Sequence, residues 1–563
     1  MRHRSEAWRK IDGASFDVCV IGGGATGSGT ALDAQLRGLR TVLIEAGDFA
    51  SATSSRSTKL IHGGVRYLQE AVTDLDPGQY NVVKRALQER RFMLDNARFL
   101  AHPMEFLVPC YSRWDVFYYF VGVKIYDRIA GKHNFFPSRY RSAKDSLARW
   151  PLLQGSGLKG TIAYADGQFD DARYCVAVVQ TFTQAGGEAV NHARVVRLEQ
   201  DAGGKICAAE IEDQLNGAKT TVRARVFVNA TGPYSDHIRE MAKPGVQKRL
   251  RLSKGVHILL PLDERTTDAV VVPKTDDGRV IFAIPWLGRL LVGTTDDEVT
   301  HEEELVVKRS EADYLLRQLN RYLSRPFAIE DIVAGFAGVR PLVSSGKPGK
   351  TKKLIREHEV EVDRESRLIS VMGGKWTTYR AMAEDAVNAV QQQLGQPVGG
   401  CVTREHHLSG SEGYSADYPQ SLVANYGLPD LTARHLSEKF GTNAGAVLDL
   451  AKQEPELAQP IVEGYPATRA EIAYSARNEM AATLDDVLER RTGLQFFSWK
   501  MARAAAPVAA AVMQKEMSWD AAHTQHEIDD YVGTISGWSA KAGVTKDGAK
   551  EQERRPERNS TSR

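Results

Sequence analysis

A glycine-rich turn between an apolar run and a helical pattern constrains this chain more than any other feature of its sequence. Residues 16–21 are typical of a short buried strand, and the spacing Gly22-x-Gly24-x-x-Gly27 follows at once. Side chains at these glycines would block the approach of backbone N–H groups and of a helix N-terminus to a pyrophosphate. The turn therefore predicts dinucleotide binding in an α/β fold.

A second strand over 41–44 ends at Glu45, an acid placed to accept hydrogen bonds from ribose hydroxyls. A chain of this length with 48 glycines is expected to contain this glycine spacing about 0.3 times by chance. The interpretation therefore depends on the flanking strands and on the acid.

Two later strands also run into glycine junctions. Residues 225–229 lead into Ala230-Thr231-Gly232, and residues 368–372 lead into Gly373-Gly374-Lys375 before a helical stretch over 378–392. We expect the three junctions to meet around one ligand. This favours FAD over NAD, because a flavin is usually held by several parts of a chain.

Composition excludes several classes of protein. The 563 residues exceed a single ordinary domain, and 73 basic against 71 acidic residues give no reason to expect nucleic-acid binding. Five separated cysteines without a CxxC pair predict neither a disulfide framework nor a thiolate metal site, and they favour a reducing compartment. We see no secretory signal and no apolar run of membrane-spanning length.

The segment 52–68, Ala-Thr-Ser-Ser-Arg-Ser-Thr-Lys-Leu-Ile-His-Gly-Gly-Val-Arg-Tyr-Leu, resembles the signature of FAD-dependent glycerol-3-phosphate dehydrogenases. The resemblance extends from about residue 16 to about residue 540 and is closest to the mitochondrial-type branch, without that branch's EF-hands. Other segments follow in the family's order: 166–168, 171–173, 229–233, 293–296, 338–341 and 373–380.

The resemblance implies oxidation of sn-glycerol 3-phosphate to dihydroxyacetone phosphate by hydride transfer to FAD, with electrons passed to a membrane quinone. It implies an α/β fold: a Rossmann-like FAD-binding domain of the D-amino-acid-oxidase/glutathione-reductase-2 type, an inserted β-sheet substrate domain and an α-helical C-terminal domain. We expect a cytoplasmic protein attached peripherally to the inner membrane, and a homo-oligomer stays open.

The expected domain boundaries follow from the same segments. We place the FAD-binding domain at 14–75, 166–235 and 336–395, the substrate domain at 76–165 and 236–335, a linker at 396–418, the helical domain at 419–540 and a disordered tail at 541–563.

Site residues are carried over from the family by position. His257 is the candidate base, Arg340 and Arg356 match the phosphate-binding arginines, and Arg66 and Lys375 are expected nearer the flavin and the C2 oxygen. Arginine forks complement phosphate oxygens with bidentate hydrogen bonds. The expected cofactor-binding residues are Gly22, Gly24, Gly27, Glu45, Ala46, Thr53, Ser54, Ser55, Lys59, His62, Ala230, Thr231, Gly232, Gly374, Lys375 and Thr377.

Several alternatives remain open at this point. The chain could be an oxidase that uses dioxygen, an amine-oxidising relative or a flavin-containing scaffold. Without the resemblance, His257 is more simply a core histidine, Arg356 a surface charge and His62 a turn cap. The aromatic stretch 113–124 with basic ends is typical either of an interfacial helix or of a buried helix.

Overall fold

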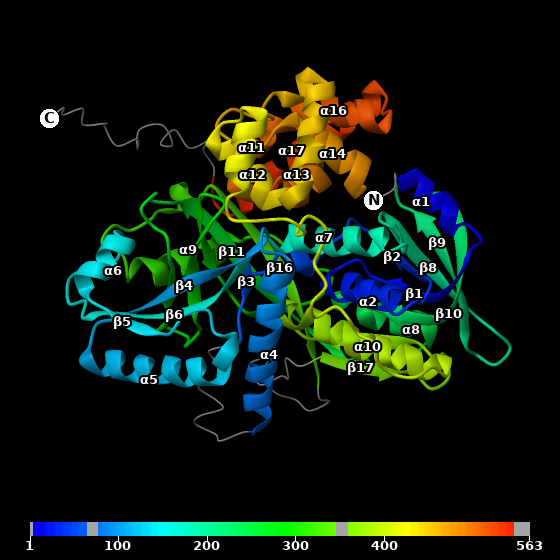
Figure 1. The fold of residues 1–563 in the computed structure, drawn as a ribbon, viewed down its shortest axis with the longest axis horizontal. Coiled ribbons are helices and arrows are strands. Elements are labelled where there is room, and N and C mark those ends of the chain that lie inside the picture. The colour runs from blue at the N-terminus through cyan, green and yellow to red at the C-terminus, as the bar shows by residue number, and fades with distance from the viewer. Residues whose placement is uncertain (1–3, 65–76, 345–357, 545–563) are drawn as a thin grey trace.

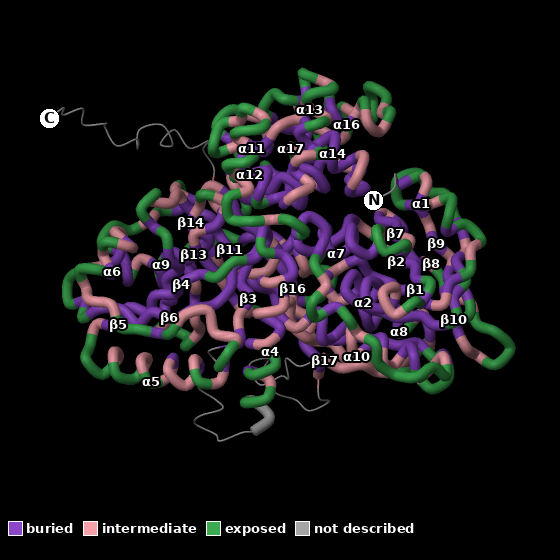
Figure 2. Tube along the Cα trace, viewed as in Figure 1, coloured by how far each residue is buried: buried purple, intermediate pink, exposed green. Residues whose placement is uncertain are grey.

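The computed structural model describes residues 4–64, 77–344 and 358–544. Figure 1 shows two β-sheets side by side and a group of C-terminal helices packed against them. Buried residues are concentrated in the two sheets and in the inner sides of the helices (Figure 2). The expected fold class is confirmed: an α/β cofactor-binding domain, a second sheet and a helical C-terminal domain.

Sheet A carries the glycine-rich turn. Its centre is parallel, in the order β18, β10, β1, β2, β7, and β2 is buried along its whole length. Such apolar strands need helices on both faces of the sheet. Within the described residues its eight strands are β1 (Ser15–Ile21), β2 (Thr41–Ile44), β7 (Glu188–Val190), β8 (Ala193–Gln200), β9 (Ile206–Asp213), β10 (Lys219–Asn229), β17 (His358–Val362) and β18 (Ile369–Gly373).

The helices associated with sheet A pack closely on one another. Helix α2 begins directly after the turn and contacts both α7 and α10. A Cβ atom at Gly29 of α2 would lie 2.8 Å from the ring of Tyr379, so glycine lets α2 and α10 approach. The helices beside this sheet are α1 (Arg4–Ile11), α2 (Ala25–Leu36), α7 (Asp171–Gln184), α8 (Ser235–Ala242) and α10 (Tyr379–Leu394).

Sheet B is the larger sheet and is mainly antiparallel. Two of its long strands, β6 and β16, cross the expected boundaries between the substrate domain and the FAD-binding domain, at 165/166 and 335/336. Each strand therefore reaches from the body of sheet B toward sheet A. Its strands are β3 (Leu60–Ile61), β4 (Ala101–Cys110), β5 (Arg139–Arg141), β6 (Gly160–Phe169), β11 (Leu250–Pro261), β12 (Ala269–Val272), β13 (Ile281–Trp286), β14 (Arg289–Gly293), β15 (Asp297–Val299) and β16 (Ala334–Val343).

Within the described residues, four helices accompany sheet B, and α5 answers a question left open by the sequence. The stretch 113–124 lies in α5, whose inner residues are buried while much of its outer side is exposed. It is therefore not the fully buried helix that was one of the two alternatives. The four helices are α4 (Pro77–Asn96), α5 (Arg113–Ala130), α6 (Ala143–Arg149) and α9 (Arg309–Asn320).

The C-terminal helices share one apolar core with sheet B. Phe496 bridges the two parts, because its ring lies 5.0 Å from that of Phe336 and 5.7 Å from that of Trp286. The helices are α11 (Tyr418–Tyr426), α12 (Asp430–Phe440), α13 (Ala444–Gln453), α14 (Arg469–Glu479), a π-helical turn (Asp486–Arg491), α15 (Leu494–Phe497), α16 (Trp499–Met517) and α17 (Ala521–Lys541).

Among the described residues, none of the helices combines the length and the apolar character needed to cross a bilayer. Three sequence-based expectations fall outside the described residues: Arg66, Arg356 and most of the expected tail, from residue 545 onward. The domain boundaries stay predictions.

Candidate active site

The turn between β1 and α2 is built on close backbone approaches. Gly22 has φ of 109°, and a Cβ atom there would lie 2.6 Å from the carbonyl oxygen of Ala230. A Cβ atom at Gly27 would lie 1.8 Å from the carbonyl oxygen of Gly22. Any side chain at these two positions would push α2 away from the turn, and the α2 N-terminus is the part of the site suited to a pyrophosphate.

Glu45 lies at the tip of β2 and its carboxylate reaches back to this turn. It accepts hydrogen bonds from the backbone N–H of Gly23 at 2.5 Å and of Gly47 at 2.7 Å. Burial raises the pKa of Glu45, while the two N–H donors act in the opposite direction. The acid is therefore positioned by the backbone at the edge where the glycines lie.

The three glycine junctions meet at one edge of sheet A, as expected. Ile21 of β1 is in register with Ile44 of β2 and with Asn229 of β10, and Asn229 is in register with Ser370 of β18. All four strands are parallel, so their carboxyl ends open on the same side, where open α/β sheets bind ligands. The Asn229 side chain holds the second junction by accepting from the Thr231 hydroxyl at 2.7 Å and donating to the Ser235 carbonyl at 2.9 Å.

The segment 53–62 joins these junctions to one another. The Ser54 hydroxyl accepts from the Ala25 N–H at the start of α2, at 2.9 Å. The Trp376 indole N–H donates to the Ser54 carbonyl at 2.8 Å, and the His62 N–H donates to the Thr377 hydroxyl at 3.3 Å. The first and third junctions are thereby linked through one loop.

Lys59 has a position that the resemblance did not lead us to expect. Its buried ammonium donates to Asp171 at 2.6 Å and to the Ser55 carbonyl at 2.5 Å. Three aromatic rings lie within about 5 Å of it, those of Trp286, Phe336 and Phe496. The side chain is therefore engaged by protein groups that hold segment 53–62 in place, and the cofactor-binding role of Lys59 stays a prediction.

His257 lies in the middle of β11, in sheet B, and is buried. Its Nε2 is 3.0 Å from the Thr58 hydroxyl, and its ring stacks on Phe336 at 4.8 Å. A Cβ atom at Gly293 on the neighbouring strand β14 would lie 2.2 Å from this ring, so glycine makes the space for it. Burial, followed by the positive charges of Arg340 and Lys59, lowers the pKa of His257 well below its ordinary value. The imidazole is therefore neutral.

Arg340 lies on β16, the strand paired with β11. Its guanidinium lies directly against Gly255 on β11. A Cβ atom at Gly255 would lie 2.3 Å from Nη2 of Arg340. The guanidinium donates to the Thr294 hydroxyl at 2.9 Å and to the Thr295 carbonyl at 3.2 Å, and Asp296 is 3.6 Å away. These contacts orient a half-buried cation beside His257.

The same segment 53–62 connects this cationic part of the site to the glycine junctions. Thr53 donates to the Val339 carbonyl at 2.7 Å, and Thr58 contacts His257, while Ser54 lies at the α2 N-terminus. The histidine, the arginine and the nucleotide-binding edge are therefore parts of one site. At the end of β18, Gly374, with φ of 83°, and Lys375 form the third glycine junction. Ala46 is exposed next to Glu45.

Sequence reasoning did not single out Thr58, Trp376 or Asn229. Thr58 and Trp376 stand inside the family-like segments, and Asn229 precedes a glycine junction, so the motifs contained them. Their roles depend on partners in other parts of the chain, such as His257, 199 positions after Thr58.

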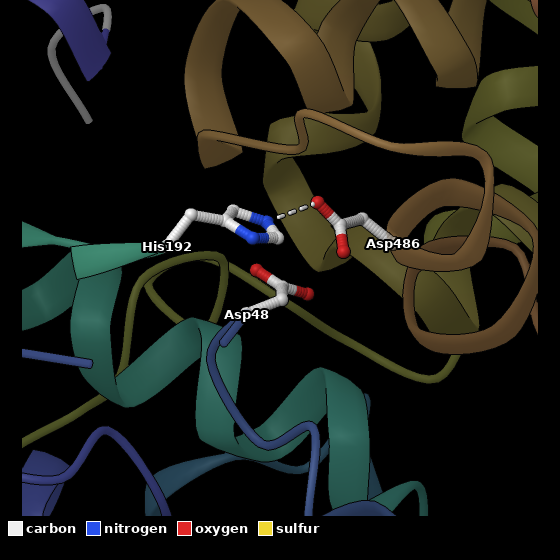
Figure 3. Close-up of side chains that lie close together, drawn as sticks. All are labelled: Asp48, His192 and Asp486. Atoms are coloured by element: carbon white, nitrogen blue, oxygen red, sulfur yellow. Dashed lines mark hydrogen bonds and ion pairs between the residues drawn. The ribbon is translucent and has the colours of Figure 1, made fainter. Parts of the chain in front are cut away.

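Three residues with metal-ligand atoms also meet where sheet A contacts the C-terminal helices (Figure 3). The His192 ring is 2.9 Å from Asp486, with Asp48 beside them. Asp48 accepts two hydrogen bonds from Arg491, at 2.7 and 2.9 Å, and another from Arg490 at 2.7 Å. The carboxylates are therefore neutralised by arginines, and the cluster is a buried ion-pair network.

Comparisons with known proteins agree with this architecture. A family model described as FAD dependent oxidoreductase matches residues 17–386, and one described as the C-terminal domain of alpha-glycerophosphate oxidase matches residues 401–524. The mitochondrial glycerol-3-phosphate dehydrogenase of Rattus norvegicus is 40% identical over 530 residues, which cover 92% of this chain and 72% of the relative. That of Arabidopsis thaliana is 39% identical over 535 residues, covering 91% and 85%.

This chain belongs to the glycerol-3-phosphate dehydrogenase family. A solved structure extends the likeness to three dimensions: the glycerol-3-phosphate dehydrogenase from Bacillus halodurans complexed with FAD superposes with a TM-score of 0.77 at 30% identity. That alignment covers 95% of this chain and 97% of the other.

The residues of this family member fit FAD. The closely packed glycines at positions 22 and 27 and the acid at position 45 form a dinucleotide cradle in which a Cβ atom would collide with backbone. The second and third junctions meet the same edge, so the chain offers the several contacts by which a flavin is held. FAD is the cofactor of the family to which the chain belongs.

Proposed function

We propose that this chain oxidises sn-glycerol 3-phosphate at C2 to dihydroxyacetone phosphate, with FAD as the acceptor in the protein and a membrane quinone as the next acceptor. The observation that best supports this proposal is that segment 53–62 joins His257 and Arg340 to the edge of sheet A that fits FAD. The relatives from Rattus norvegicus and Arabidopsis thaliana, both glycerol-3-phosphate dehydrogenases, support the choice of substrate.

Arg340 binds the substrate's phosphate in this proposal. A phosphate carries about −1.5 to −2 charges near neutral pH, and a guanidinium meets it with charge-assisted, bidentate hydrogen bonds. Thr294 and Thr295 already hold the Arg340 side chain, so little of its freedom is lost on binding. Arg356 is proposed as the second phosphate ligand, and Arg66 and Lys375 are proposed to lie near the C2 oxygen.

His257 takes the proton of the C2 hydroxyl. The neutral ring can accept a proton, and we assign acceptance to Nε2 because this atom faces Thr58 and hence segment 53–62. Phe336 and the space above Gly293 fix the plane of the ring. The positive charge of Arg340 stabilises the alkoxide that develops as the proton leaves. When bound, FAD supplies the two-electron acceptor for the hydride that departs from C2.

The cofactor contacts are proposed from the same geometry. Gly22, Gly24 and Gly27 with the α2 N-terminus take the pyrophosphate, and Glu45 takes the ribose hydroxyls. The remainder of the cradle is lined by residues from all three junctions and from segment 53–62: Thr53, Ser54, Ser55, His62, Ala230, Thr231, Gly232, Gly374, Lys375 and Thr377.

A quinone acceptor places the enzyme at a membrane surface, because quinones dissolve in lipid. We propose peripheral attachment on the cytoplasmic side of the inner membrane. This fits the finding that none of the described helices is suited to span a bilayer.

The test compares donors and acceptors in turnover assays of the FAD-loaded protein. We expect product from sn-glycerol 3-phosphate and none from glycerol, which lacks the phosphate, or from glycine, which offers an amine. Quinone should support faster turnover than dioxygen. Faster turnover with dioxygen, accompanied by formation of hydrogen peroxide, would identify the chain as an oxidase. Turnover with glycine would contradict the proposal that the site recognises its substrate by the phosphate.

A further inference from the structure

The π-helical turn Asp486–Arg491 carries charged side chains of the C-terminal helices into the interior of the protein, and all of its residues are buried. Turns of this kind are frequent at functional sites. The two arginines of the turn bind Asp48, on the side of sheet A (Figure 3). Glu489 makes a different contact, with segment 53–62 of the candidate active site.

Glu489 is paired with Arg56, which lies in segment 53–62 two positions before Thr58. The two paired residues are 433 positions apart in the chain, and Nη2 of Arg56 lies 3.3 Å from each carboxylate oxygen of Glu489. Glu489 also accepts from Nη1 of Arg490 at 2.9 Å. Because the Glu489 side chain is fully enclosed, its attraction for Arg56 is only weakly screened by water and salt.

The remainder of Arg56 is packed against strand β16, close to the candidate base. Its Nη1 donates to the Ala337 carbonyl at 3.5 Å, and a Cβ atom at Gly338 would lie 2.7 Å from the Arg56 carbonyl oxygen. Ala337 is in register with the residue that precedes His257 on β11. The guanidinium also faces the ring of Trp538 of α17, at 5.6 Å. Arg56 is thus held between the C-terminal helices and the strand beside the candidate base.

A second contact from the C-terminal helices reaches the same part of the site. The ring of Phe496 lies 5.0 Å from that of Phe336, and the ring of Phe336 stacks on His257 at 4.8 Å. Phe496 also lies 4.8 Å from the ammonium of Lys59 in segment 53–62. The C-terminal helices therefore support the candidate base both by an apolar contact and by an ion pair.

The ion pair is poorly suited to a purely stabilising role. Burial raises the pKa of the Glu489 carboxyl, which reflects the cost of taking its charge out of water, while Arg56 and Arg490 act in the opposite direction. Among the described residues, Oε1 of Glu489 and Nε of Arg56 are buried and have no hydrogen-bond partner. A buried pair that only stabilised the fold would gain from satisfying these atoms or from replacement by apolar side chains. Unsatisfied buried groups in native proteins often have a functional explanation.

We propose that Glu489 is a positioning residue for the reaction, which acts through Arg56 on segment 53–62. Only one residue separates Arg56 from Thr58, whose hydroxyl lies 3.0 Å from Nε2 of His257. A shift of Arg56 therefore moves the group that orients the base. A misplacement of about 1 Å can slow a reaction about 100-fold. The inference rests on the proposed function for one point, the role of His257 as the base.

The first experiment compares Glu489→Gln with Asp485→Asn in the FAD-loaded protein. Asp485 is the matched control, because it also pairs with Arg490, at 2.7 Å, and within the described residues it forms no ion pair with Arg56. In Glu489→Gln, the rate constant for flavin reduction by sn-glycerol 3-phosphate should fall at least about tenfold, with the FAD content unchanged. In Asp485→Asn it should fall less than about twofold. An unchanged rate constant in Glu489→Gln, or a loss of FAD that explains the lower rate, would overturn the proposal.

A double-mutant cycle tests whether Glu489 acts through Arg56. Arg56→Gln should also slow flavin reduction, and the variant with both changes should be no slower than the slower single variant, because both changes remove one interaction. Effects that multiply would show that Glu489 acts by another route and would overturn the proposal.

Glu489→Asp replaces Glu489→Gln where the uncharged variant does not fold. It keeps the negative charge but is shorter, so it cannot hold Arg56 in the same place. We expect flavin reduction to slow at least about threefold in Glu489→Asp. Reduction at the wild-type rate would show that the charge alone matters and would contradict a positioning role.

Amide hydrogen exchange, read by mass spectrometry on the FAD-loaded protein without substrate, separates this inference from the function on which it rests. Peptides that cover segment 53–62 should exchange faster in Glu489→Gln than in the wild type or in Asp485→Asn, while peptides that cover β1 should not change. Equal exchange of segment 53–62 in Glu489→Gln and the wild type would overturn the inference. If sn-glycerol 3-phosphate did not reduce the flavin of the wild type, the proposed function would fail, and faster exchange in Glu489→Gln would still show that Glu489 holds this segment.

Discussion

The charge of Arg340 helps to set the protonation state of His257, the other residue assigned to the chemistry. This charge is, after burial, the largest cause of the lowered pKa of His257. The cation proposed to bind the phosphate thus also keeps the proposed base unprotonated. Thr58 and Phe336 complete the arrangement by fixing the ring between two strands of sheet B.

The lowered pKa of His257 makes a prediction about pH. A base with a lowered pKa stays neutral as pH falls below its ordinary value of about 6.5 and is lost only when pH falls through the lowered value. The rate constant for flavin reduction should therefore keep its plateau below pH 6.5. The pH profile of anaerobic single-turnover reduction measures this, and a decline centred at or above pH 6.5 that His257→Asn abolishes would contradict it.

Arg340 and His257 should affect different constants. Arg340→Ala removes a charge-assisted contact worth about 1.5–3 kcal/mol, so the dissociation constant of sn-glycerol 3-phosphate should rise about 10- to 100-fold. His257→Asn should mainly slow flavin reduction. Titration of the reduction rate against substrate separates the two effects. Arg251→Ala is the control, because Arg251 pairs with Glu298 at a partly exposed position of β11. An equal rise of the dissociation constant in Arg251→Ala would contradict the role proposed for Arg340.

At the scale of elements, the turn after β1 is the part of the molecule that tolerates least change. Gly27 lies in the first helical turn of α2, where the helix contacts the glycine-rich segment after β1. A Cβ atom at Gly27 would lie 1.8 Å from the carbonyl oxygen of Gly22. The second junction is packed against the same turn, because a Cβ atom at Gly22 would lie 2.6 Å from the carbonyl oxygen of Ala230.

Gly27→Ala should therefore abolish tight binding of FAD while leaving the helical content intact. Flavin absorbance per protein after purification gives the result directly, and circular dichroism checks the fold. Gly533→Ala in α17 is the matched control, because a Cβ atom there meets nothing within 4 Å. Full retention of FAD by Gly27→Ala would show that the cradle lies elsewhere.

The elements of sheet A could be predicted because their signals are local. The apolar runs at 16–21 and 41–44 became β1 and β2, and the helix expected over 378–392 became α10 at Tyr379–Leu394. The engagement of Lys59 by Asp171 could not be predicted, because the two residues are 112 positions apart and neither has a local pattern. The exposure of α5 likewise depends on what packs against it, which the amphipathic sequence alone left undecided.

At the scale of the whole molecule, buried ion pairs fasten the C-terminal helices to sheet A. Asp48 meets Arg491, which is 443 positions away, and Arg173 of α7 pairs with Glu479 of α14 at 2.6 Å. Burial would raise the pKa of Asp48, but Arg491 and Arg490 outweigh burial, and the pKa is lowered. The charged form of Asp48 is therefore part of the folded structure.

Asp48→Asn should destabilise the protein strongly, because it leaves two buried arginines with less compensating charge. Breaking a buried pair in this way costs about 3–5 kcal/mol of the free energy of unfolding. Denaturant titration measures the loss, and Asp313→Asn, which removes an exposed pair with Arg309, should have a much smaller effect. Equal losses in the two variants would show that the network does not fasten the domains.

The most direct test of the account is rapid anaerobic mixing of the FAD-loaded protein with sn-glycerol 3-phosphate while the flavin absorbance is followed. We predict complete loss of the oxidised flavin band, slower with substrate that carries deuterium at C2, and no loss with glycerol. A flavin that stays oxidised, or one that glycerol reduces equally fast, would contradict a site built to hold a phosphorylated alcohol and take its C2 hydride.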